Sequence, residues 1–173
     1  MEKSDPVSEA ANKTSGAARV QMISERRETP KLSRMLGYAA MAPLAGAAGL
    51  VWLAPESAAL IRALAIVWGA LILVFLAGVR RGVGFRTEHS PATSQLVIMG
   101  WLFALGLAAL LAPWPAASLG FLAAGYATLL FADPPAALAG RLPLFMARLR
   151  PPQMTIAVIA LAVLLGHLAA GAA

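Results

Sequence analysis

The sequence contains no cysteine, few acidic residues and few aromatic residues. Of its 173 residues none is Cys, 8 are Asp or Glu, and 7% are aromatic. The lack of thiols excludes disulfides, zinc-thiolate sites, iron–sulfur clusters and cysteine nucleophiles. Ser and Thr have no His–carboxylate partner in reach, and no Gly-rich phosphate-binding loop is present. The sequence therefore predicts neither an enzyme nor a cofactor.

Metal-ligand patterns are equally scarce. The two histidines, His89 and His167, have no second ligand at helical spacing. A lone histidine in or near an apolar segment is typical of an interfacial or hydrogen-bonded residue rather than a metal or haem ligand. We predict no metal site.

Charge is also sparse, whereas apolar residues are abundant. Charged residues make up 13% of the chain and hydrophobic residues 60%, and the mean hydropathy is +0.74. Soluble domains are about 45–50% apolar and about 25% charged. The difference predicts an all-α integral membrane protein, because the apolar residues gather into runs long enough to cross a bilayer. The five predicted spans are residues 36–54, 58–79, 96–112, 116–132 and 154–170.

The breaks between these spans have their own signals. Pro113-Trp114-Pro115 predicts a tight turn between the third and fourth spans, since two prolines in three residues interrupt a helix. Residues 136–150 are ambiguous, because apolar residues recur there at helical spacing among several prolines. A short amphipathic helix on the membrane surface and an irregular loop are the two interpretations.

The distribution of positive charge predicts the topology. With the N-terminus in the cytoplasm and the C-terminus outside, 13 of the 14 Lys and Arg residues fall on the cytoplasmic side, and only Arg62 falls outside. This is the asymmetry that the positive-inside rule describes. The net charge of +6 therefore indicates contact with anionic headgroups rather than with nucleic acid.

Residues 1–35 are polar, of mixed charge and poor in large apolar residues. Such a segment buries too little surface to offset its chain entropy, so we predict a disordered cytoplasmic tail. A short amphipathic helix near residues 17–27 is the alternative. The transmembrane domain is expected to occupy residues 36–173.

Two groups of residues are candidate sites. Gly78 and Gly82 form a GxxxG motif that favours either close helix packing or a helix cap. Better placed for packing are the small pairs Ala45/Gly49, Ala104/Ala108 and Gly120/Ala124.

The second group is a set of charges expected at the inner surface. One carboxylate among several guanidinium groups predicts an ion pair that ties two inner loops, or a pocket for a phosphorylated headgroup. Its residues are Arg80, Arg81, Asp133, Arg148 and Arg150.

Several stretches resemble a known family. Residues 73–82, LVFLAGVRRG, resemble the FLGG-x-x-WG signature of domain of unknown function 3429, which includes transmembrane protein 69. Leu36-Gly37 with Pro43, Asp133, and residues 145–150 followed by Met154-Thr155 resemble its other motifs in order and spacing, over residues 36–168. Ala77 replaces a glycine of the signature and Arg81 its usual tryptophan. The resemblance implies a five-span protein of bacterial or mitochondrial inner membranes and no established activity.

The predicted function is that of a non-catalytic accessory, assembly or scaffold subunit in a bacterial inner membrane, in contact with lipid and other membrane proteins. The alternative is a small carrier or channel for a neutral or anionic solute. No Asp, Glu or Lys lies within a predicted span. Coupled transporters need such a group to bind the ion or proton, so this weighs against the alternative.

Overall fold

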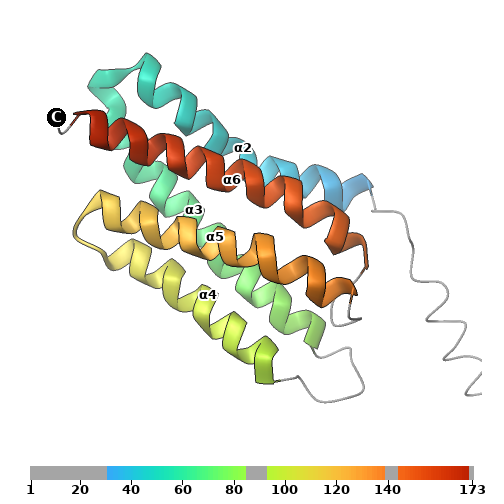
Figure 1. The fold of residues 1–173 in the computed structure, drawn as a ribbon. Coiled ribbons are helices and arrows are strands. Elements are labelled where there is room, and N and C mark those ends of the chain that lie inside the picture. The colour runs from blue at the N-terminus through green and yellow to red at the C-terminus, as the bar shows by residue number, and fades with distance from the viewer. Residues whose placement is uncertain (1–30, 85–92, 139–143, 172–173) are drawn as a thin grey trace, which may run out of the picture.

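The computed structural model describes residues 31–84, 93–138 and 144–171, and these residues form helices and short turns with no strand. The helices are α2 (Lys31–Leu53), η1 (Pro55–Ser57), α3 (Ala58–Gly84), α4 (Thr93–Leu111), α5 (Pro115–Leu138) and α6 (Leu144–Gly171). Figure 1 shows them as an up-and-down bundle with α2 and α6 side by side. α5 packs against α6, α4 and α3, and α3 also packs against α2 and α4.

The helices are long and apolar enough for a membrane. The segments Arg34–Leu53, Pro55–Gly82, Pro115–Leu138 and Met146–Gly171 each meet the length and hydropathy of a membrane span, and Gln95–Leu111 is a shorter apolar helix. α4 has 19 residues in all. At a rise of 1.5 Å per residue it is about 28 Å long, close to a hydrocarbon core of about 30 Å.

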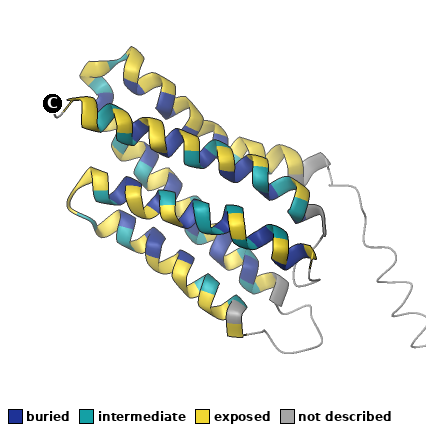
Figure 2. Ribbon diagram, in the orientation of Figure 1, coloured by how far each residue is buried: buried dark blue, intermediate teal, exposed yellow. Residues whose placement is uncertain are grey.

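Burial within the bundle is confined to the faces where helices meet (Figure 2). Leu44, Leu73, Leu122 and Leu161 are fully buried, whereas Leu53 and many other large apolar side chains point outward. A monomer in water rarely exposes so much contiguous apolar surface. The all-helical fold and the apolar outer surface agree with the prediction of a membrane protein.

The turns join the helices at alternate ends of the bundle. The α2–α3 turn, the α4–α5 turn and the end of α6 share one end, named here the Trp114 end (Figure 1). The predicted turn at Pro113-Trp114-Pro115 is confirmed, since α4 ends at Leu111 and α5 begins at Pro115. Ser118 N donates to the carbonyl oxygen of Trp114 at 3.1 Å and closes the first turn of α5. The opposite end is named the Asp133 end.

At the Asp133 end the helices continue past the predicted spans. α5 runs through Pro134 and Pro135 to Leu138, and α6 begins at Leu144, before Pro151 and Pro152. Residues 136–138 and 144–150 are thus neither a separate surface helix nor a loop, and residues 139–143 lie outside the described residues. Proline removes a helical hydrogen bond, but packing by neighbours offsets that loss in membrane helices. Here Met146 is buried against Ala136 and Ala137, which fixes the start of α6 on the end of α5.

The predicted tail is corrected at its end. Residues 31–35 belong to α2, because the helix starts before the apolar run does. Residues 1–30, including the candidate helix at residues 17–27, lie outside the described residues.

Two polar contacts tie the middle of the bundle together. Tyr126, fully buried on α5, donates its hydroxyl to the carbonyl oxygen of Gly69 on α3 at 2.9 Å. Trp101 on α4 donates from Nε1 to Oγ1 of Thr128 on α5 at 3.3 Å. Both donors therefore have an acceptor on a neighbouring helix, as an apolar environment requires.

Candidate functional site

Asp133 lies at the centre of the polar cluster at the Asp133 end. Its oxygen Oδ1 is 3.1 Å from Nη1 of Arg80 on α3, and Oδ2 is 3.5 Å from Nε of Arg150 on α6. Asp133 has no exposed surface, and Arg80 and Arg150 are 4% and 6% exposed. One carboxylate on α5 thus joins three helices.

Arg80, Asp133 and Arg150 are named here the triad. The contacts within the triad are ion pairs rather than well-directed hydrogen bonds. Both distances lie within ion-pair range, yet neither carboxylate oxygen of Asp133 accepts a hydrogen bond of good geometry from the described residues. The distances therefore indicate Coulombic attraction between the carboxylate and the two guanidinium groups. This attraction is strong where water is excluded. Removing one partner of such a buried group is costly, because the remaining charge is left uncompensated.

The structure brings together three of the five predicted cluster residues. Arg148 is exposed, whereas Arg150 is buried. The side chains of residues two positions apart on a helix point about 200° apart around its axis, so only one of these arginines can face Asp133. Arg81 is half-buried and makes an interaction of its own. Asp133 does pair with guanidinium groups, as predicted, but the three residues lie inside α3, α5 and α6 rather than in the inner loops.

Gly78 and Gly82 neither pack against another helix nor end a helix within the described residues. Both are exposed, and a Cβ atom built on either would meet nothing within 4 Å among the described residues. α3 continues to Gly84, so neither residue ends the helix.

The glycines that allow close packing lie in mid-helix. A Cβ on Gly106 of α4 would lie 2.8 Å from Cγ2 of Val74 and 3.4 Å from the carbonyl oxygen of Ala70. A Cβ on Gly125 of α5 would overlap the side chain of Leu73. The α3–α4 and α3–α5 contacts therefore depend on these two positions, which no short motif marks.

A second polar cluster lies at the Trp114 end. Nη1 of Arg62 on α3 is 3.2 Å from Nδ1 of His167 on α6. The ring of Trp52 on α2 meets the His167 ring edge to face, with centroids 4.8 Å apart. His167 is thus hydrogen-bonded, as the sequence predicted. Sequence reasoning missed its partners Arg62 and Trp52, which lie near the helix ends that share the Trp114 end of the bundle.

Metal ligands do not gather in the described part of the chain. Residues 31–84, 93–138 and 144–171 hold no group of three or more His, Cys, Asp or Glu side chains that could bind an ion.

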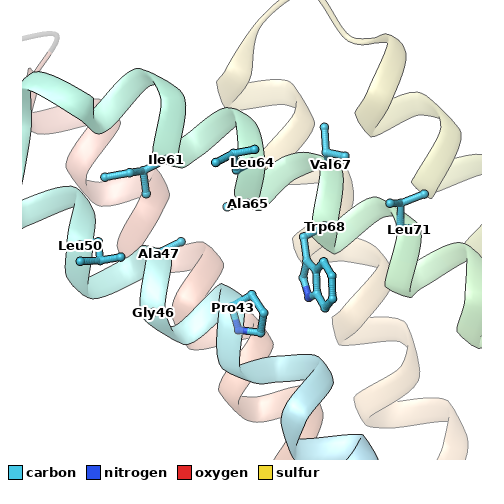
Figure 3. Close-up of a pocket in the computed structure, with 10 residues that line it drawn as sticks. All are labelled: Pro43, Gly46, Ala47, Leu50, Ile61, Leu64, Ala65, Val67, Trp68 and Leu71. Atoms are coloured by element: carbon cyan, nitrogen blue, oxygen red, sulfur yellow. The ribbon is translucent and has the colours of Figure 1, made fainter.

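An apolar groove lies between α2 and α3, as drawn in Figure 3. Its volume is about 460 Å³. Pro43, Gly46 and Leu50 line it from α2, and Leu64 and Trp68 line it from α3 (Figure 3). Trp68 donates from Nε1 to the carbonyl oxygen of Ala40 at 2.9 Å, which holds the indole across the groove.

The face of α2 beside this groove consists of small residues. Ala42, Ala45, Gly46 and Gly49 are all exposed, and a Cβ on either glycine would meet open space. They form two pairs at four-residue spacing, one of them the predicted pair Ala45/Gly49. Small residues so spaced let another helix backbone approach closely in a membrane.

The other predicted small pairs also fail to pack within the chain. Gly120 and Ala124 are exposed on α5, and Ala104 is exposed on α4. Small-residue spacing alone therefore does not identify the contacts inside this bundle.

No known family, curated protein or solved structure matches the chain. The resemblance to domain of unknown function 3429 stays a prediction.

Proposed function

We propose that the chain is a non-catalytic scaffold or assembly subunit that crosses a bacterial inner membrane five times and binds a transmembrane helix of another protein. The observation that carries this proposal is the α2–α3 groove. It is open, lined by apolar side chains and flanked by the exposed small residues of α2.

A partner helix suits this surface for a physical reason. Lipid chains are as apolar as leucine, so helices associate in a bilayer through close van der Waals packing rather than the hydrophobic effect. Ala42, Gly46 and Gly49 allow a backbone to come near α2, and the groove beside them can accept large side chains of that helix. The five apolar runs of the sequence and the positive-inside asymmetry of its loops support five crossings.

Photo-crosslinking in native membranes tests the proposal. A benzoyl-phenylalanine residue in place of Leu50, at the groove, is expected to give one major protein adduct of defined mass. The same residue in place of Phe103, exposed on α4, is expected to give none. Equal adducts at both positions would show that the groove has no special role.

The Gly46→Leu substitution sharpens this test. The added side chain fills the groove edge without touching the chain's own core, since a Cβ there meets open space. We expect the yield of the adduct at position 50 to fall about tenfold, because overpacking at an interface weakens binding by about this much. The matched control is Gly100→Leu, an exposed glycine on α4 with equally open surroundings. Unchanged crosslinking in Gly46→Leu would contradict the proposal, and partner-free solute transport in liposomes would favour a carrier.

A further inference from the structure

A second cavity lies at the Asp133 end between α2, α3 and α6. Its volume is about 240 Å³, and its walls are mostly apolar. Leu36 of α2 and Phe75 of α3 line it and are 62% and 64% exposed, so the cavity opens onto the outer, apolar surface of the bundle. It is separate from the α2–α3 groove, with which it shares no lining residue.

Two polar side chains line this cavity, and both are buried. Arg150 is 6% exposed and Gln153 is 3% exposed. They lie three residues apart on α6 and so share one face of the helix. Nε2 of Gln153 finds no hydrogen-bond acceptor among the described residues, although it is fully buried. An amide left without a partner in an apolar environment is costly, so this position points to an absent acceptor.

Gly37 makes room for that amide. A Cβ atom on residue 37 would overlap Nε2 of Gln153 and lie 2.8 Å from its Cδ. A larger residue at position 37 would therefore displace the amide of Gln153 from its present position.

Arg150 also has donors to spare. A guanidinium group carries five N–H donors, and Arg150 shares the single carboxylate of Asp133 with Arg80. An anion in the cavity would complement that positive charge, and a phosphate oxygen suits both a guanidinium and an amide N–H.

The depth of these groups fits a lipid phosphate. Arg80, Asp133 and Arg150 lie four to six residues from the ends of α3, α5 and α6, which is about 6–9 Å along a helix. The headgroup layer is about 5–8 Å thick on each side of the hydrocarbon core. A charged group near this boundary meets phosphates, and apolar walls below it meet acyl chains.

We propose that this cavity binds one anionic phospholipid, whose phosphate contacts Arg150 and Gln153 and whose acyl chain leaves the cavity past Phe75. The apolar walls and the opening toward the bilayer favour a phospholipid over a free anion. The site stands independently of the partner-binding groove.

Native mass spectrometry of the purified full-length chain tests the site with defined lipids. Wild type is expected to retain phosphatidylglycerol about tenfold more than phosphatidylcholine, because both lipids carry the phosphate but the choline cation of phosphatidylcholine is repelled by the positive charge of Arg150. Gln153→Leu should retain about tenfold less phosphatidylglycerol, because the phosphate loses a hydrogen bond. It should unfold no more readily than wild type without lipid, because it removes an unpartnered amide. Gln95→Leu, which removes an amide at the same end on α4, should retain phosphatidylglycerol as wild type does.

The same measurement gives the contrary outcomes. Equal retention of the two lipids by wild type, or undiminished retention of phosphatidylglycerol by Gln153→Leu, would overturn the proposal. Inorganic phosphate that raises thermal stability as much as phosphatidylglycerol does would show a free-anion site instead. Ala40→Leu, which fills the cavity wall, should weaken retention, whereas Ala39→Leu on the exposed face should not.

Discussion

Substitution of Asp133 by Ala is expected to lower the free energy of unfolding by about 3–5 kcal/mol. The change removes the one carboxylate that contacts both Arg80 and Arg150. It leaves two buried guanidinium groups facing each other at the junction of α3, α5 and α6. Thermal unfolding in detergent micelles, followed by tryptophan fluorescence, measures the loss.

Two further variants serve as controls for this experiment. Glu56→Ala removes an exposed carboxylate at the other end of the bundle and should change stability by no more than about 0.5 kcal/mol. A triple variant with Arg80→Met, Asp133→Leu and Arg150→Met should recover most of the loss, because apolar replacement of a whole buried ion cluster is often neutral. Unchanged stability in Asp133→Ala would show that the triad does not tie the helices.

Substitution of Gly106 by Ala is expected to destabilise the bundle by about 1–3 kcal/mol. The new Cβ would lie 2.8 Å from Cγ2 of Val74, and the backbone oxygen of Ala70 is 3.4 Å away. Val74 cannot rotate away easily, because a β-branched side chain has one favoured rotamer in a helix. α3 and α4 must therefore separate slightly, which the same unfolding measurement detects.

Gly100→Ala is the matched control on the same helix. Residue 100 is exposed and its Cβ would meet open space, so this variant should keep or slightly raise stability through better helix propensity. If the two variants behave alike, the close approach of α3 and α4 at Gly106 is not a determinant of stability.

The helices of the bundle follow from simple features of the sequence. The apolar runs and Pro113-Trp114-Pro115 define where α4 ends and α5 begins, because both act locally through burial and backbone geometry. The continuation of α5 through Pro134 and of α6 through Pro151 was not predictable in this way. It depends on the packing of Met146 against Ala136. This is a tertiary contact between two helices, which local sequence patterns do not predict.

The polar triad was only partly predictable. The sequence predicts that Arg80, Asp133, Arg148 and Arg150 lie at the same end of the bundle, because each lies near one end of an apolar run. Which arginine faces the carboxylate depends on the rotation of α6 about its axis, which core packing decides. Gln153 escaped notice because an uncharged amide near a span end has no distinctive signal until Gly37 is placed against it.

Glycine packing shows the same limit. The motif Gly78–Gly82 has the right spacing but lies on an outward face, whereas Gly106 and Gly125 lie singly at contacts with α3. Spacing identifies residues that share a face, and tertiary packing alone decides which face another helix covers.

The crossing of a bilayer by these helices can be tested directly, because the chain contains no cysteine. Single cysteines at Ser57, Trp114 and Thr87 can be labelled in intact cells with a maleimide that does not cross membranes. We expect Ser57→Cys and Trp114→Cys to react from outside, and Thr87→Cys to react only after the membrane is opened. Opposite sides for residues 57 and 114, or labelling of all three in intact cells, would contradict the proposed bundle.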